Sequence, residues 1–60
     1  MNNKKFAEKV VKTGITIVED KWGDKLIAAF GKTYYVRFDD GRVQGCAKMT
    51  PDEWKWGHED

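Results

Sequence analysis

The stretch TYYVRFDDGRVQGCAKM, residues 33–49, decides the fold. Its Asp40-Gly41 pair lies between two runs in which apolar and polar residues alternate. Such a pair favours a type I′ turn, because both central residues of that turn need a positive φ. The stretch therefore predicts a β-hairpin with a two-residue loop, and the loop fixes the register. The expected facing pairs are Phe38–Val43, Arg37–Gln44, Val36–Gly45, Tyr35–Cys46 and Tyr34–Ala47.

The two faces of the predicted hairpin differ in character. Alternation along each strand assigns the core face to Tyr34, Val36, Phe38, Val43, Ala47 and Met49. It assigns the outer face to Thr33, Tyr35, Arg37, Arg42, Gln44, Cys46 and Lys48. The outer face is polar and mildly basic, so it is a candidate binding surface. Gly45 inside a strand indicates a bulge or a close approach of another part of the chain.

The segments before the hairpin predict one helix and two strands. Residues 3–13 have the apolar spacing of an amphipathic helix, with Asn3 as the N-cap and Gly14 at the end. The β-branched run at 15–20 predicts a strand. Residues 26–30, LIAAF, fit a buried strand, but Asp24 is also a suitable cap for a short helix. The short spacing typical of a meander favours the strand.

The segment after the hairpin predicts a short helix. Thr50, Pro51 and Glu53 form a helix start, with Thr50 as the cap and Glu53 closing a capping box. Gly57 limits the helix to residues 51–56, and residues 58–60 are expected to fray. The whole chain is therefore predicted to be one α+β domain, residues 1–60. Its elements are a helix at 3–13 packed on a three- to four-stranded antiparallel meander, strands at about 15–20, 25–30, 33–39 and 42–49, and a helix at 51–56.

The composition and charge of the chain exclude several classes of function. The chain has 60 residues and one cysteine, so it forms no internal disulfide, and it has too few metal-ligand types for a structural zinc site. Its 11 basic and 10 acidic residues give a net charge of +1, which argues against a DNA mimic and against a strong nonspecific nucleic-acid binder. No apolar run is long enough to span a membrane, and the N-terminus lacks the apolar core of a signal peptide. The single cysteine favours a cytoplasmic location.

The Trp54-Lys55-Trp56 run is the first candidate binding site. Positions i and i+2 lie about 200° apart on a helix, so a small core does not easily bury both rings. An exposed tryptophan is a favoured anchor at protein interfaces. We therefore expect a protein partner to contact Trp54 or Trp56, with Tyr35 and Arg37 as further contact residues.

The outer face of the hairpin offers an alternative, because platforms for single-stranded nucleic acid combine a sheet-borne aromatic ring with basic groups. The residues of this alternative site are Tyr35, Arg37, Arg42 and Lys48, with Lys5 and Lys9 of the first helix.

The sequence does not predict catalysis. Asp39-Asp40 is explained by turn chemistry, since Asp is favoured before Gly in this turn. Cys46 lacks a positioned base, because the only histidine, His58, lies in the tail. The glycines are dispersed and form no phosphate-binding loop. We expect no catalytic residues, no metal and no cofactor.

Two parts of the sequence resemble known families. The span 14–56 resembles small SH3-like or Tudor-like barrels, in which a strongly curved meander ends in a short turn; such barrels bind peptides, modified tails or nucleic acid. Separately, Tyr35-Val36, Phe38-Asp39, Gly45-Cys46 and Thr50 with Glu53 are similar to the strand-strand-helix core of HicB-type antitoxins, which bind and mask a small ribonuclease toxin. The second resemblance implies a role in masking another protein.

The expected function is therefore binding without catalysis. We expect a small intracellular regulator or inhibitor that acts by binding another protein, of the sort that phage or mobile-element genes encode. Nucleic-acid binding by the outer face of the hairpin is the alternative. The chain is expected to be a monomer or homodimer that does not associate with a membrane.

Overall fold

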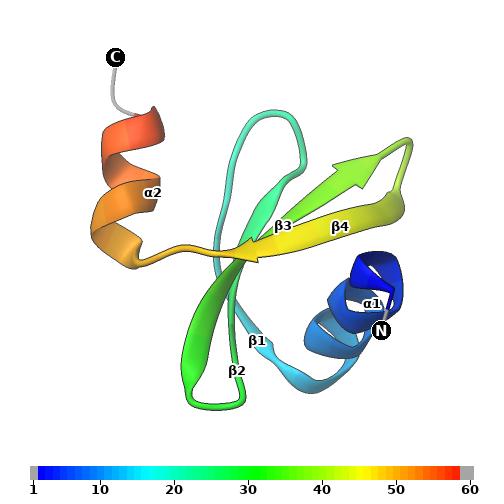
Figure 1. The fold of residues 1–60 in the computed structure, drawn as a ribbon. Helices are drawn as coiled ribbons and strands as arrows, with labels where there is room; N and C mark the ends of the chain where they lie inside the picture. The colour runs from blue at the N-terminus through cyan, green and yellow to red at the C-terminus, as the bar shows by residue number, and fades with distance from the viewer. Residues whose placement is uncertain (1, 59–60) are drawn as a thin grey trace.

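Four antiparallel strands form a meander in the order β1-β2-β3-β4, with a helix at each end of the chain (Figure 1). The structure is a computed structural model that describes residues 2–58. Its elements are α1 (Asn3–Thr13), β1 (Ile15–Glu19), β2 (Lys25–Ala29), β3 (Lys32–Asp39), β4 (Arg42–Lys48) and α2 (Pro51–His58). The α+β fold class is confirmed, and the LIAAF segment lies largely in strand β2. In residues 2–58, β1 and β4 lie at opposite edges of the sheet, so the sheet is open and does not close into a barrel.

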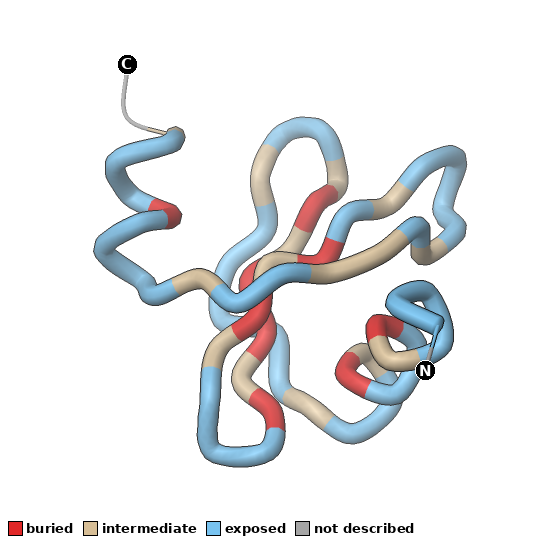
Figure 2. The backbone as a smooth tube through the Cα atoms, viewed as in Figure 1, coloured by how far each residue is buried: buried red, intermediate tan, exposed pale blue. Residues whose placement is uncertain are grey.

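The core lies between α1 and one face of the sheet. Ala7 and Val10 of α1 are fully buried against the sheet, which contributes Ile27, Tyr34 and Val36 to the same cluster. Figure 2 shows buried segments on α1 and along the strands of the sheet, with a further one on α2. Burying one such aliphatic side chain contributes about 1.5–3 kcal/mol, so this contact is a main source of stability for a small chain.

The start of α1 differs from the prediction. Asn2, and not Asn3, is the N-cap, since its side chain accepts a hydrogen bond of 2.8 Å from the Lys4 backbone N–H. Asn3 is the first helical residue, and its side-chain amide instead forms hydrogen bonds with the backbone of Cys46. At the other end Gly14 is required by close packing, because a Cβ there would lie 2.5 Å from a methyl group of Ile27.

The hairpin turn is confirmed, but the register holds only next to it. Asp40 and Gly41 have φ of 54° and 77°, as a type I′ turn requires, and Phe38 pairs with Val43 as predicted. A bulge at Gln44 then shifts the ladder by one residue. The pairs become Arg37–Gly45, Val36–Cys46, Tyr35–Ala47 and Tyr34–Lys48.

The shift exchanges the two faces of β4 for the residues beyond Gln44. Cys46 packs on the α1 side with the core, whereas it was predicted on the outer face. Lys48 also moves to the α1 side, because it faces Tyr34. Ala47 moves the other way, beside Tyr35, and is exposed. The physical reason is that one extra residue in a strand reverses the direction of every side chain beyond it.

Candidate functional site

Strand β1 is an uncovered edge of the sheet. All five of its residues are exposed, and the apolar side chains of Ile15 and Ile17 have exposed fractions of 75% and 51%. Within residues 2–58 no strand lies beyond β1, so the outer N–H and C=O groups of the strand have no ladder partner there. A bulge between Thr16 and Val18 bends the strand. β1 thus presents both backbone polar groups and apolar side chains to a second chain.

The opposite edge, β4, is covered. The Asn3 side chain donates a hydrogen bond of 3.0 Å to the Cys46 carbonyl and accepts one of 2.9 Å from the Cys46 N–H. The amide therefore occupies the position that a neighbouring strand would take. Gly45 makes room for it, because a Cβ at residue 45 would lie 2.5 Å from Asn3 Oδ1. The two edges of the sheet consequently differ in their readiness to pair.

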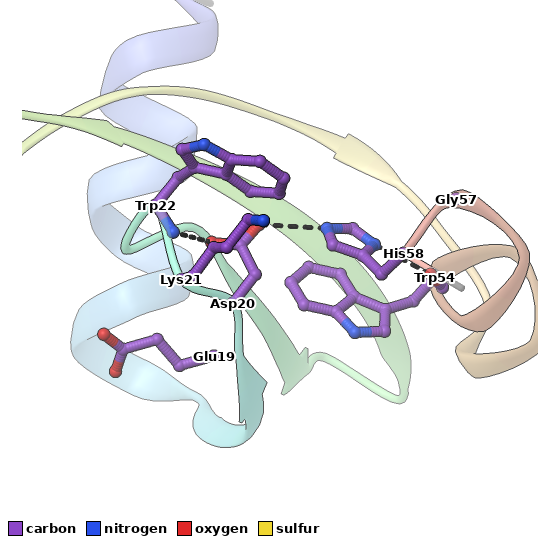
Figure 3. Close-up of a pocket in the computed structure, with 7 residues that line it drawn as sticks. All are labelled: Glu19, Asp20, Lys21, Trp22, Trp54, Gly57 and His58. Carbon is purple, nitrogen blue, oxygen red and sulfur yellow. Dashed lines mark hydrogen bonds and ion pairs between the residues drawn. The ribbon is translucent and has the colours of Figure 1, made fainter. Parts of the chain in front are cut away.

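A cavity of about 280 Å³ lies at the end of β1. Its lining consists of Glu19, Asp20, Lys21, Trp22, Trp54, Gly57 and His58. Figure 3 shows the indoles of Trp22 and Trp54 on opposite sides of the Asp20 carboxylate, with His58 reaching that carboxylate from α2. The β1–β2 turn and the last turn of α2 thus enclose the cavity.

Asp20 organises this cavity. Its Oδ1 accepts hydrogen bonds of 2.9 Å from the backbone N–H groups of Trp22 and Asp24, which shape the turn. Its Oδ2 lies 2.9 Å from Nε2 of His58, and Nδ1 of His58 lies 2.8 Å from the Trp54 carbonyl oxygen. The hydrogen bond to the Trp54 carbonyl raises the pKa of His58, and Asp20 raises it further. The protonated imidazole can donate to both acceptors at once.

Stacking completes the contact between α2 and the sheet. The His58 ring lies on the Trp54 indole with their centroids 3.9 Å apart, and Trp54 packs against Tyr35 at 5.7 Å. The Tyr35 hydroxyl donates a hydrogen bond of 2.7 Å to the buried carboxylate of Asp24. Burial, together with Asp24, raises the pKa of Tyr35 to about 12. Tyr35 is therefore engaged on both its ring and its hydroxyl.

The residues predicted for partner binding occupy different environments. Trp54 is 7% exposed and belongs to the contact between α2 and the sheet, whereas Trp56 is 72% exposed. Tyr35 is half-buried under Trp54, and Arg37 is exposed on the same face of β3. Trp56 is therefore the tryptophan of the pair that is free to contact another molecule.

The basic residues of the nucleic-acid alternative are divided between the two sides of the sheet. Arg37 and Arg42 lie on the face away from α1, while Lys48 lies on the face that α1 covers. Lys5 and Lys9 are exposed on α1 itself. The fold thus does not gather them around Tyr35.

Sequence reasoning missed the cluster of Trp22, Asp20 and His58. His58 was expected to fray, yet it is the last residue of α2 and bonds a residue 38 positions earlier. One local signal points to part of the cluster, because Trp54 and His58 are four residues apart and share a helix face. Nothing in the sequence links that face to Asp20.

Residues 2–58 contain no group of three or more His, Cys, Asp or Glu side chains placed to hold a metal ion. Burial raises the pKa of the Cys46 thiol, which favours its protonated form. Among the described helices, none has the length and apolar character needed to cross a membrane.

No protein-family model, curated protein or solved structure matches this chain.

Proposed function

We propose that the protein is a non-enzymatic binding domain that recruits an extended segment of another protein along the free edge of β1. The observation that carries this proposal is that all five residues of β1 are exposed, in an edge strand rich in β-branched apolar residues. An added strand would satisfy the outer backbone groups of β1 and cover its apolar side chains. The domain would act as a regulator or inhibitor by occupying part of its partner.

The contrast between the two edges supports this assignment. Folded proteins protect their edge strands, since an open edge pairs readily with other chains. Here α1 supplies Asn3 to close β4, but β1 has no such cover within residues 2–58. Among the residues of β1 only Glu19 is charged. The bulge in β1 limits pairing with arbitrary flat strands, which favours a partner of matching shape.

An intracellular setting forms part of the proposal. The single cysteine is unpaired, and unpaired thiols are usual where the environment is reducing.

The test is a pull-down with the tagged protein from a nuclease-treated lysate of its source cells, comparing two variants. Ile17→Lys places a charge in the middle of the exposed edge. Trp56→Lys makes the same kind of change at an exposed apolar residue on α2, away from β1, and is the matched control. Far-UV circular dichroism checks that both variants remain folded.

We expect the wild type to recover a stoichiometric protein partner. The Trp56→Lys variant should retain this partner, and the Ile17→Lys variant should lose it. Retention by Ile17→Lys would refute the edge as the binding surface. Loss with Trp56→Lys alone would move the partner to α2, and loss of all recovery on nuclease treatment would replace protein binding with nucleic-acid binding.

A further inference from the structure

Helix α2 lies against the face of the sheet opposite α1, and few of its side chains hold it there. Figure 1 shows the two helices on opposite sides of the sheet. Within α2 the only buried residue is Trp54, whose indole packs against Tyr35. Leu26 pairs with Tyr35 in the ladder, so it lies on the same face, where it is 1% exposed. This apolar contact is separate from the core under α1.

The second attachment of α2 is His58, whose imidazole lies between two acceptors (Figure 3). Its Nε2 lies 2.9 Å from Oδ2 of Asp20, and its Nδ1 lies 2.8 Å from the carbonyl oxygen of Trp54. A neutral imidazole has one N–H group, so it can donate to only one of these oxygens, and its other nitrogen then faces an acceptor without a proton. The imidazolium donates to both. The arrangement therefore fits the charged ring and neither neutral tautomer.

The groups around His58 also favour its charged form. The hydrogen bond to the Trp54 carbonyl raises the pKa of His58, burial lowers it, and the carboxylates of Asp20 and Asp24 raise it further. On β3 the nearest titratable group is Tyr35, whose pKa of about 12 keeps its hydroxyl neutral. The other charged residues nearby are Glu19 and Lys21, which line the same cavity, and Lys55 in the last turn of α2.

We propose that α2 is a lid over the face of the sheet that carries Tyr35, and that a proton on His58 holds this lid closed. With the ring protonated, two hydrogen bonds hold the last turn of α2 against the β1–β2 turn. When the ring loses its proton, one of the two oxygens loses its donor and the lid opens more often. An isolated helix of eight residues is marginal in water, so α2 unfolds as it leaves the sheet.

Opening of the lid would change the surface beside β1. Val18 of β1 pairs with Leu26 and is itself exposed, so the face under α2 continues to the edge strand. An open lid adds Leu26 and Tyr35 to this exposed apolar surface. The inference goes beyond the proposed function, because the lid opens and closes whether or not β1 binds a partner.

Linkage between docking and protonation sets the size of the effect. Docking raises the pKa of His58, so the stabilisation of the closed lid is complete below the ordinary pKa of about 6.5. It is lost as the pH rises through the docked pKa. Each unit by which docking raises that pKa lowers the ratio of closed to open lid about tenfold across the titration.

The test is native-state hydrogen exchange of the ¹⁵N-labelled chain from about pH 5 to about pH 8. Protection factors are compared, because they divide out the base catalysis of exchange itself. The reporter of the lid is the Trp54 amide, which bonds the Thr50 carbonyl at 3.0 Å, and the reporter of global unfolding is the Val36 amide in the central strand β3. NMR titration of the His58 ring protons gives the docked pKa in the same sample.

The Trp54 amide is expected to be less protected than the Val36 amide at every pH, because it exchanges through local opening. Its protection factor should fall as the pH rises, by the factor that the measured pKa of His58 dictates. Its exchange should also depend less on urea than that of Val36, since opening of the lid exposes less surface than global unfolding.

Two substitutions distinguish the proton on His58 from a general effect of pH. His58→Gln removes the titrating group, so the protection of α2 should no longer depend on pH. Asp20→Asn keeps the acceptor for the turn amides at Oδ1 and places an N–H donor where Oδ2 lay. The neutral ring then donates from Nδ1 to the Trp54 carbonyl and accepts at Nε2. In this variant the protection of α2 should therefore rise with pH.

Four results would overturn the inference. Equal protection of the Trp54 and Val36 amides would mean that α2 leaves the sheet only on global unfolding. Protection of α2 that does not change with pH, or a fall that persists in His58→Gln, would mean that the His58 proton does not control the lid. A fall with rising pH in Asp20→Asn would exclude the hydrogen bond to Asp20 as the control.

Discussion

The side chain of Asn3 holds the outer edge of β4 closed, and Asn3→Ala should open it. The substitution removes both hydrogen bonds to the Cys46 backbone, of 2.9 and 3.0 Å. Each such bond contributes about 0.5–1.5 kcal/mol net. Because the edge is exposed, water can replace the lost partners, so the expected loss lies near the lower end of the sum, about 1–2 kcal/mol. At 60 residues, total stability is about 3–9 kcal/mol, and the loss is a substantial part of it.

The assay is urea unfolding combined with native-state hydrogen exchange, and Asn2→Ala is the matched control. Asn2 is the N-cap of α1, so its loss also costs about 1 kcal/mol but leaves the Asn3–Cys46 bonds in place. Both variants should lose protection wherever exchange needs global unfolding. Asn3→Ala should show an additional loss at the Cys46 amide. Equal exchange of that amide in the two variants would refute the account of the β4 edge.

Other predictions concern the contact between α2 and the sheet. Trp54→Ala removes a buried indole and should lower the free energy of unfolding by about 3 kcal/mol in urea, whereas Trp56→Ala should change it by less than about 0.5 kcal/mol. The pKa of His58 is raised by the Trp54 carbonyl and then by Asp20, so the stability that its protonated form contributes is complete below the unfolded pKa of about 6.5. That contribution should disappear as the pH rises through the folded pKa; unfolding measured across this range checks it, and a gain in stability would contradict it. Asp24→Asn should move the pKa of Tyr35 from about 12 part of the way toward 10, with burial keeping the remainder, and ultraviolet titration of tyrosinate measures it. An unchanged titration would mean that Asp24 does not act on the phenol.

Most elements of the fold were predictable because they have a strong local signal, whereas residues 26–30 also fitted a short helix and only the spacing of the meander favoured the strand. The Asp40-Gly41 turn requires two positive φ angles, and those residues adopt them at little cost. The ladder beyond Phe38 was predicted in the wrong register, because alternation in a sequence does not show where an extra residue enters a strand. Gly45 gave a hint of irregularity, but the hint did not locate the bulge at Gln44.

The errors at the helix ends come from contacts between distant segments. Asn2 and Asn3 have identical capping chemistry, and the need of the β4 edge for a hydrogen-bonding partner distinguishes them. Likewise, the spacing of Trp54 and Trp56 indicates that one ring is exposed but not which one. Contact with Tyr35 buries Trp54, and that contact joins elements separated by a hairpin strand and a turn. The candidate site was also missed because contacts between distant segments form it, as the bond between His58 and Asp20 shows.

The most direct test of the proposed binding edge is an amide map of the protein in contact with its partner. The ¹⁵N-labelled chain is added to a nuclease-treated lysate of its source cells, and the loss of each backbone signal is compared with its intensity in buffer. Binding along the edge predicts selective loss of the signals of Ile15–Glu19, with the exposed face of α1 least affected. Selective loss at α2 or around Arg37, with β1 unchanged, would contradict it.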